Sequence, residues 1–370
     1  MHPPRIIHFH PSEKYAPIFL EPLMVAERSH GYASTMVNSA YFSSKGKRVI
    51  PYDICLRNLP ALLIAFIRIC LFLKSQNPSV VISHNAKSSS LPLFAAWLMG
   101  VRSRVYYNHG VPFIAYRGLL RYLLMGLERV NCLLATNIIT VSSDMRDVLL
   151  RLMPEKKITI IGHGSACGLD LSLYGAKRYT ESSFRKDHGI SMDDFVVVFV
   201  GRPESRKGYN LILRLWQDYL KEDEYKLIIC GSDVSDALRV LPKIPSNIIC
   251  MGFTQKIPEI LSNSNVLILP SLHEGLSYAI LEAMASGCLV LANDIEGIRN
   301  LVRSGENGYL ISNNSPSAYV LAIKSLRHQI WETDAVRRNS LKTAKLFSRK
   351  QFIPNYLVFI EEVLASVKRY

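Results

Sequence analysis

The sequence predicts an α/β protein with parallel β-sheets in two domains. Short runs of consecutive apolar residues, such as 195–200, alternate with longer amphipathic segments, as in sheets that helices cover on both faces. The segment 265–292 contains a strand, a loop, a helix and a second strand, which is one parallel-sheet unit. A chain of 370 residues is also long for a single hydrophobic core, so we expect two domains.

The composition is that of a globular protein, with 49% apolar and 20% charged residues, which excludes a disordered chain. Seven scattered cysteines without a C-x-x-C pair favour reduced thiols over a zinc site or a disulfide framework. The first residues lack the apolar core of a secretory leader. The longest apolar run, 59–73, is too short and too charged to span a membrane, so we expect a cytoplasmic protein.

The positive charge is concentrated in the first part of the chain. Residues 1–165 contain 19 Lys and Arg against 8 Asp and Glu, whereas residues 166–370 contain 25 against 22. A basic first part predicts an anionic partner, and nucleic acid, an acidic membrane leaflet or a phosphorylated substrate would each fit. Ordinary solubilising charge is the alternative.

In the first part, we expect a helix over 19–32 and a buried or surface-docked helix over 59–73. A basic turn, 45–48, lies between them. We expect strands at 5–10, 79–83, 105–108, 137–141 and 158–161. His109 follows one of these strands and precedes Gly110, so it should stand at the carboxyl edge of the sheet. A single histidine more often has a structural role than a role in a site, so the residues around His109 must decide between the two.

A leucine-rich segment with arginines, 110–130, follows His109. Arg117 and Arg121 share one helical face, and Leu119, Leu123 and Leu127 share another. A basic amphipathic helix is typical of a membrane-surface element, although a core helix with solvated arginines has the same pattern. Taken with the basic first part, the pattern leads us to prefer docking to an anionic leaflet.

The second part begins with the apolar strand 195–200 and a basic loop, 201–208, that contains Arg202 and Lys207. A loop between a strand and a helix is a suitable place for cations that bind phosphate, and a surface basic loop is the alternative. Strands are then expected at 226–230 and 248–251, with Phe253 in the turn after the latter.

Two carboxylates, Glu274 and Glu282, are eight positions apart in the segment 270–294. If the helix starts near Glu274, both can face one side of it. The amides of Gly275, Leu276 and Ser277 would then lie at the helix N-terminus, where anions bind. Gly287 should end the helix. An ordinary unit with two surface glutamates fits the spacing equally well.

The sequence patterns of these segments resemble those of retaining, nucleotide-sugar-dependent glycosyltransferases of the GT-B fold, family 4. EGLSYAILEAMASGCLVLAND resembles their Glu-x7-Glu segment, and GRPESRKG resembles their GRxxxxKG loop. VVISHNAKSSSLPLFAAWLMGVRSRVYYNHG resembles the N-terminal stretch of bacterial surface-polysaccharide enzymes, and GHGSACGLD resembles their interdomain linker. Departures from the family's pattern are Leu276-Ser277 for Phe-Gly, Leu289 for Pro, Cys167 for Asn, and a loop 11–14 without glycine.

The resemblance implies a fold and a set of residue roles. The fold is GT-B, with two Rossmann-like domains whose parallel sheets face each other across a cleft. Residues 1–165 would bind the acceptor, 166–347 the nucleotide sugar, and 348–370 would form a helix returning to the first domain. The implied site residues are Arg202 and Lys207 on the diphosphate, Glu282 on the ribose, Phe253 in the turn against the base, Glu274 with Gly275, Leu276 and Ser277 at the donor sugar and diphosphate, and His109 at the sugar from the first domain.

The implied reaction is retaining transfer from a nucleotide diphosphate sugar, with UDP preferred, to a polyprenyl-diphosphate-linked saccharide in O-antigen or capsule assembly. The enzyme would lie on the inner face of the cytoplasmic membrane. No Asp-x-Asp pair ends a strand, so we expect neither a metal nor another cofactor. No nucleic-acid recognition motif is present. The alternatives are a sugar-nucleotide epimerase of the same fold, a basic nucleic-acid or membrane-binding protein without activity, and an inactive scaffold.

Overall fold

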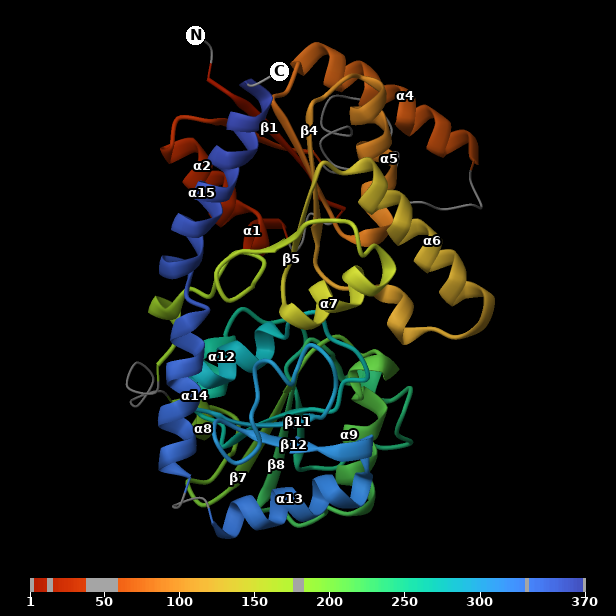
Figure 1. Cartoon of the computed structure of the whole chain (residues 1–370). Helices are drawn as coiled ribbons and strands as arrows, with labels where there is room; N and C mark the ends of the chain where they lie inside the picture. The colour runs from red at the N-terminus through yellow and green to blue at the C-terminus, as the bar shows by residue number, and fades with distance from the viewer. Residues whose placement is uncertain (1–2, 12–15, 38–58, 176–182, 330–332, 369–370) are drawn as a thin grey trace. The chain divides into compact units, whose positions relative to one another are not determined.

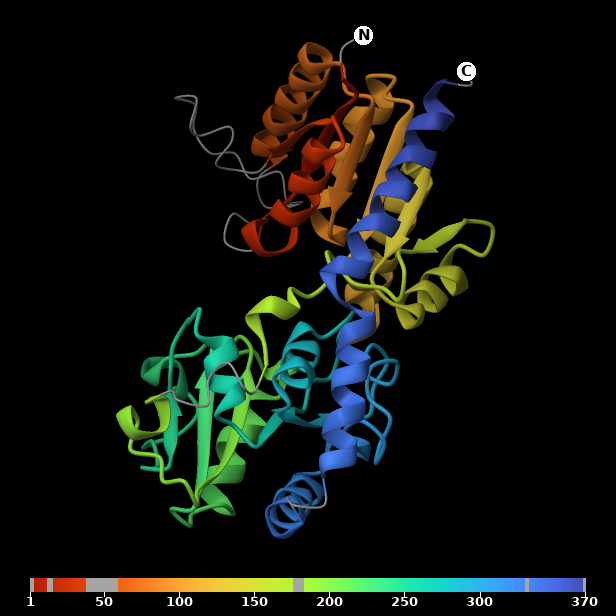
Figure 2. The same ribbon diagram turned by 90° about the vertical axis from the view of Figure 1, so that its left-hand side faces the viewer.

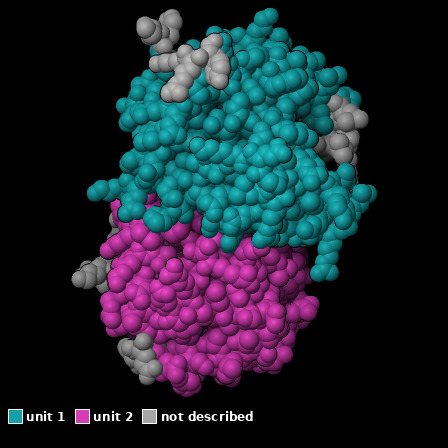
Figure 3. Space-filling view, viewed as in Figure 1, with its two compact units in different colours: residues 1–168, 349–370 teal, residues 169–348 magenta. Residues whose placement is uncertain are grey.

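The computed structural model describes residues 3–11, 16–37, 59–175, 183–329 and 333–368 (Figure 1). The chain divides into two compact units, one formed by 1–168 with 349–370 and the other by 169–348 (Figure 3). The sequence predicts domain changes after residues 165 and 347, and the compact units change after 168 and 348.

The first unit contains a six-stranded parallel sheet in the order β2-β1-β3-β4-β5-β6. Its strands are β1 (Arg5–Phe9), β2 (Ala33–Val37), β3 (Val80–His84), β4 (Ser103–Asn108), β5 (Asn137–Thr140) and β6 (Ile158–Ile160). Its helices are α1 (Ala16–Phe19), α2 (Glu21–Ser29), α4 (Leu59–Gln76), α5 (Ala86–Leu98), α6 (Gly118–Leu134), α7 (Ser143–Leu152) and α15 (Arg349–Lys368).

The strand order explains how the helices cover this sheet. The chain runs from β1 to β2 and then crosses to β3 on the other side of β1, so successive right-handed crossovers place helices on opposite faces. α4, α5 and α6 pack side by side on one face, and α2 packs against α15 on the other (Figure 1). The strands lie between these two layers (Figure 2).

The second unit contains a parallel sheet in the order β12-β11-β10-β7-β8-β9. Its strands are β7 (Phe195–Val200), β8 (Tyr225–Cys230), β9 (Ile248–Cys250), β10 (Val266–Leu269), β11 (Leu289–Asn293) and β12 (Tyr309–Ile311). Its helices are α8 (Phe184–Asp187), α9 (Tyr209–Asp218), α10 (Val234–Ala237), α11 (Ile257–Ser262), α12 (Tyr278–Ser286), α13 (Pro316–His328) and α14 (Asp334–Leu346). The central strands β7 and β10 are apolar throughout and form the middle of the core.

Two predicted helices have different bounds in the structure. The segment 19–32 is divided between α1, α2 and the approach to β2, because Pro22 can stand only in the first turn of a helix. In 110–130, a 3-10 turn (Pro112–Ala115) comes first and α6 begins only at Gly118, so Arg117 caps the helix rather than lying on its face. The basic turn 45–48 and most of the loop 11–14 lie outside the described residues.

Two further expectations concern the membrane and the cysteines. Within the described parts of the chain, no helix has the length and apolar character needed to cross a bilayer. The six cysteines in those parts are free thiols, and Cys55 lies outside them.

Candidate functional site

The topology of the second unit brings two loops to one place. Strands β7 and β10 are neighbours, but the chain leaves β7 toward β8 on one side and β10 toward β11 on the other. In open α/β sheets, ligands bind at the carboxyl ends of such a pair of strands. The loops that follow β7 and β10 are 201–208 and 270–277, which contain the predicted cations and the first predicted carboxylate.

Lys207 and Glu274 join these loops directly. Nζ of Lys207 donates to both carboxylate oxygens of Glu274, at 2.6 and 2.9 Å. The side chain of Glu274 is only 7% exposed and that of Lys207 19%, so the pair is largely removed from water. A buried carboxylate needs such a partner, because an unpaired buried charge costs several kcal/mol. A cation of the loop after β7 and a carboxylate of the loop after β10 therefore meet at this place.

The backbones of the loops also approach closely. The amide of Leu272 donates to the carbonyl oxygen of Arg206 at 2.8 Å. Gly208 has φ +76, and a Cβ there would lie within 2.5 Å of the carbonyl oxygen of Pro270. The loop after β11 is equally close, because a Cβ on Gly297 would overlap the carbonyl oxygen of Glu274. Glycine is therefore required at both positions, and three loops pack around Glu274.

Arg202 forms its ion pair within its own loop. Its Nη1 atom lies 2.8 Å from Oε1 of Glu204, and Nε of Arg206 lies 2.6 Å from Oε2 of the same carboxylate. The side chain of Arg202 is 56% exposed. Among the described residues its ion pair is with Glu204 and not with Glu274. Glu204 was missed at the sequence level, although an acid between two arginines in a phosphate-type loop is a visible signal.

Glu282 lies on α12 and accepts a hydrogen bond from the hydroxyl of Tyr174 at 2.9 Å. Burial raises the pKa of Glu282 to about 7, against the lowering effect of the bond from Tyr174. Near neutral pH this carboxyl therefore changes its charge easily. Tyr174 is more than a hundred positions away from Glu282 in the sequence and belongs to no motif. The sequence alone therefore could not have paired the two residues.

The start of α12 corrects the predicted geometry of the Glu-x7-Glu segment. The helix begins at Tyr278, with Ser277 as its N-cap in an extended conformation, so Glu274 stands in the loop. Gly275, Leu276 and Ser277 precede the helix, and the first-turn amides belong to residues 278–280. The orientation of Glu274 is consequently set by Lys207 and not by a helix face. The predicted helix stop at Gly287 is confirmed, with φ 74.

Phe253 lies in the turn after β9, and 58% of its surface is exposed. This turn is tied to the loop after β8, because the amide of Gly231 donates to the carbonyl oxygen of Gly252 at 2.7 Å. The amide of Gly252 in turn donates to the carbonyl oxygen of Ser232 at 3.0 Å. The loops that follow β8 and β9 therefore form one structure at the same edge of the sheet.

His109 belongs to the first unit, whereas the other predicted site residues belong to the second. It follows β4, and its Nε2 atom lies 2.9 Å from Nδ1 of His84, at the end of β3. Burial lowers the pKa of His109 to about 3, with a smaller contribution from His10, so the imidazole is neutral at physiological pH. The histidine belongs to a buried polar network that includes His8, which the sequence analysis did not assign. The available signal was the alternation of His8 and His10 in an apolar strand.

Comparisons with known proteins agree with this fold. The model described as "Glycosyl transferases group 1" matches residues 180–342, and "Glycosyltransferase Family 4" matches residues 28–165. The capsular polysaccharide biosynthesis glycosyltransferase CapM of Staphylococcus aureus is 25% identical over 71% of this chain and 70% of its own. The UDP-Gal:alpha-D-GlcNAc-diphosphoundecaprenol alpha-1,3-galactosyltransferase of Escherichia coli is 26% identical over 68% of this chain and 67% of its own.

Among solved structures, HepE of Anabaena in complex with UDP-glucose superposes with a TM-score of 0.76 at 16% identity, covering 97% of this chain and 99% of HepE. The two parallel sheets and this likeness show that the chain has the GT-B fold. With both family models matching consecutive parts, the chain belongs to glycosyltransferase family 4.

Proposed function

We propose that this glycosyltransferase transfers a sugar, with retention of configuration, from a UDP-sugar to a polyprenyl-diphosphate-linked saccharide. The observation that carries the proposal is the buried Lys207–Glu274 pair at the junction of the loops after β7 and β10. It brings a cation for the diphosphate and a carboxylate for the sugar to one place. Residues 1–165 would hold the acceptor, residues 166–347 the donor.

The chemistry of the reaction requires such a cation. The bond between the anomeric carbon and the diphosphate oxygen breaks, and the electron pair stays on the diphosphate. Lys207 and Arg202 would stabilise this added charge, and the N-terminus of α9, which follows Gly208, would add its aligned amides. The acceptor hydroxyl would form the new bond on the same face of the sugar, and its proton would pass to the departing diphosphate.

The other site residues would position the donor. Glu282 would accept hydrogen bonds from the ribose hydroxyls, and the turn at Phe253 would pack against the base. Glu274 would contact the sugar as positive charge develops on it, and His109 would contact the sugar from the first unit. The reaction as proposed requires neither a metal nor another cofactor.

Two relatives support the choice of donor and acceptor. The name of the Escherichia coli relative gives UDP-galactose and a diphosphoundecaprenol-linked sugar as that protein's substrates, and the Staphylococcus aureus relative belongs to capsule assembly. By this likeness we assign to the present protein a UDP-sugar and a lipid-linked saccharide.

A lipid-linked acceptor implies contact with a membrane, and the layer α4–α5–α6 has suitable surface chemistry. Its outer side chains form what we call the apolar face, and they are far more exposed than core residues. The most exposed members are Leu63, Leu71, Trp97, Leu119, Tyr122, Leu123 and Leu133. The only carboxylate on these three helices, Glu128, is fully buried, whereas Arg121 and Arg129 are exposed. Apolar groups with cations and no exposed acid suit the inner, anionic leaflet.

Donor binding tests the first half of the proposal. The full chain should gain thermal stability with a UDP-sugar and less with GDP- or dTDP-sugars, because a ligand that binds only the folded state stabilises it. Purified lipid-linked saccharide should then accept the sugar, and the anomeric configuration of the product should equal that of the donor. Release of an altered free sugar nucleotide without an acceptor would instead establish the epimerase, and inversion would overturn the retaining mechanism.

A further inference from the structure

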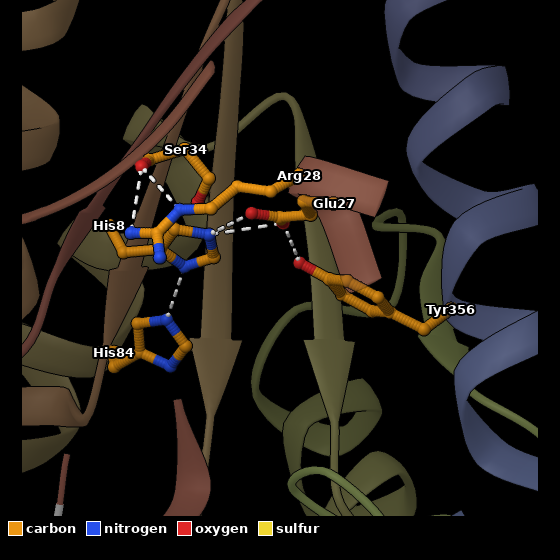
Figure 4. Close-up of polar contacts among 6 residues, drawn as sticks. All are labelled: His8, Glu27, Arg28, Ser34, His84 and Tyr356. Atoms are coloured by element: carbon orange, nitrogen blue, oxygen red, sulfur yellow. Dashed lines mark hydrogen bonds and ion pairs between the residues drawn. The ribbon is translucent and has the colours of Figure 1, made fainter. Parts of the chain in front are cut away.

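A row of buried polar side chains connects the C-terminal helix to His109 within the first unit, and Figure 4 shows the part of the row from Tyr356 to His84. The hydroxyl of Tyr356 on α15 donates to Glu27 on α2 at 2.6 Å. The carboxylate of Glu27 lies 3.0 and 3.1 Å from Nε2 of His8 on β1. Nδ1 of His8 lies 3.1 Å from Nε2 of His84, and Nδ1 of His84 lies 2.9 Å from Nε2 of His109. Five elements thus contribute one continuous hydrogen-bonded row.

The row lies out of water almost entirely. His8, Glu27 and Tyr356 have no exposed surface, and His84 is 1% exposed. Ionisable groups are costly in such a place unless each is hydrogen-bonded, so their placement needs an explanation beyond packing. Within the described residues, no group of three ligating side chains is arranged to hold a metal ion.

The charges along the row follow from its neighbours. Burial alone raises the pKa of Glu27, but the attraction of His8 and the bonds that the carboxylate accepts outweigh it, so that the pKa lies below its ordinary value. Burial and the nearby His109, His8 and His10 hold the pKa of His84 well below its usual range. Glu27 is therefore ionised, and His84 is neutral.

These charges set the direction of the hydrogen bonds. An ionised buried carboxylate is balanced when His8 is an imidazolium, which donates from both ring nitrogens. Nε2 of His84 must then accept, which leaves the proton of His84 on Nδ1. That proton is donated to Nε2 of His109, so the single proton of neutral His109 resides on its own Nδ1.

We propose that the ion pair of Glu27 and His8, acting through His84, selects the Nδ1–H tautomer of His109. This inference rests on the proposed function, in which His109 contacts the sugar. Glu27, His8 and His84 are positioning residues. Among the described residues Nδ1 of His109 has no hydrogen-bond partner, so its N–H is available to donate to a substrate oxygen. His109 consequently acts as a hydrogen-bond donor and not as a general base.

The tautomer can be measured directly in the full chain labelled with 15N-histidine. Two-bond 1H–15N correlation spectra, recorded near neutral pH without ligand, distinguish the two neutral tautomers and the imidazolium. Spectra of His8→Gln, His84→Gln and His109→Gln assign the signals. We expect Nδ1–H for His84 and His109 and protons on both nitrogens of His8. Nε2–H on His109, or a neutral His8, would overturn the proposal.

Variants test the cause. Glu27→Gln keeps the size of the side chain but removes the charge on which the row depends, so His109 should no longer be held as Nδ1–H. Loss of the carboxylate that holds the tautomer of a histidine in the site should lower kcat about tenfold or more, while KM for the donor changes little. Tyr356→Phe removes one bond but keeps the carboxylate, so the tautomer of His109 should persist. An unchanged tautomer in Glu27→Gln would refute the role of the ion pair.

Glu361→Gln is the matched control, because Glu361 is on the surface of α15, where it forms an ion pair with the exposed His30 at 4.0 Å. It should change neither the tautomer nor the rate. The spectra need no donor, so the two proposals can fail separately. Absence of transfer with every sugar nucleotide would end the proposed function but leave the tautomer assignment intact. If the protein transfers the sugar but His109 carries its proton on Nε2, only the present inference is refuted.

Discussion

Lys207 is the residue on which the proposed donor site should depend most. It is the cation that meets the buried Glu274, whereas Arg202 is engaged by Glu204 in its own loop. Arg202 is also more than half exposed, so its attraction to Glu204 is screened by water and the guanidinium can turn to a diphosphate at low cost. The structure thus divides two residues that look equivalent in the sequence. In the proposed reaction, Lys207 would be held in place before the donor binds, and Arg202 would turn from Glu204 to the diphosphate.

Replacement of Lys207 should therefore affect both activity and stability. Lys207→Ala should lower transfer about a hundredfold or more, because a fixed charge at the leaving group is lost. It should also lower the melting temperature, since Glu274 would remain buried without its partner. Arg239→Ala, which breaks the exposed pair with Asp236, is the control and should be neutral in both assays. Near-normal transfer by Lys207→Ala would remove this residue from the site.

The raised pKa of Glu282 predicts that donor binding depends on pH. Its pKa of about 7 means that it gains a proton as the pH falls below neutral, and a protonated carboxyl is a poorer acceptor for ribose hydroxyls. The dissociation constant for UDP should rise by up to about tenfold per pH unit below this pKa and be flat above it. Calorimetric titration between about pH 5.5 and 8.5 measures this dependence.

Glu282→Gln has no proton to gain in this range and is the matched control. Its dissociation constant should stay constant with pH, at a value above that of the wild type at high pH. Equal pH dependence in the two proteins would show that another group is responsible.

Among the elements, the loop between β7 and α9 has a conformation that is set by its contact with the loop after β10. Gly208 is the closest point, where a Cβ would meet the side chain and backbone of Pro270. A loop packed so tightly has little freedom to adjust, which is how backbone amides keep a fixed geometry for a diphosphate.

Gly208→Ala should therefore abolish measurable donor binding and lower stability. Gly189→Ala separates the effect of backbone strain from that of the contact with Pro270. Gly189 also has a positive φ, +65, but nothing lies within 4 Å of its Cβ position. Both variants bear the backbone strain of alanine in this conformation, about 1 kcal/mol. The additional loss in Gly208→Ala, measured by thermal unfolding and UDP titration, reports the contact. Equal effects would mean that Pro270 moves aside freely.

At the scale of the whole molecule, each unit carries its ligand chemistry at the carboxyl ends of its strands. The histidine row stands beside the β1–β3 junction of the first unit, and Lys207 and Glu274 stand beside the β7–β10 junction of the second. The first unit also bears the apolar face. The arginines on this face belong to the excess of Lys and Arg over Asp and Glu in residues 1–165. Binding to a membrane is therefore expected to be a property of the first unit.

Vesicle sedimentation tests this expectation. The protein should bind vesicles that contain an anionic lipid, and binding should weaken in neutral vesicles or at high salt. Leu119→Glu with Leu123→Glu should release it, because both leucines are exposed on α6. Leu321→Glu, equally exposed on α13 of the other unit, should bind as the wild type does. Binding that survives the α6 substitutions would place the membrane contact elsewhere.

The sequence by itself determined most of the strands, although not β2 or β12, together with the order of the motifs and the family. Strand β7 has the predicted bounds, Phe195–Val200, because an apolar run between turns is a local pattern. The Glu-x7-Glu segment and the basic loop likewise depend only on neighbouring residues. The tertiary structure alone decided that Lys207, and not Arg202, meets Glu274, and that Tyr174 bonds to Glu282.

The tertiary structure also decided that His109 ends a row reaching back to Tyr356, and which side of α4, α5 and α6 faces solvent. These features join side chains that are tens to hundreds of positions apart. Their geometry depends on how strands are ordered and where each backbone turns, for example on α12 beginning at Tyr278 rather than near Glu274. A local sequence pattern specifies whether a segment is a helix or a strand and which of its residues are buried. The partner of a buried charge depends instead on which residues folding brings next to it.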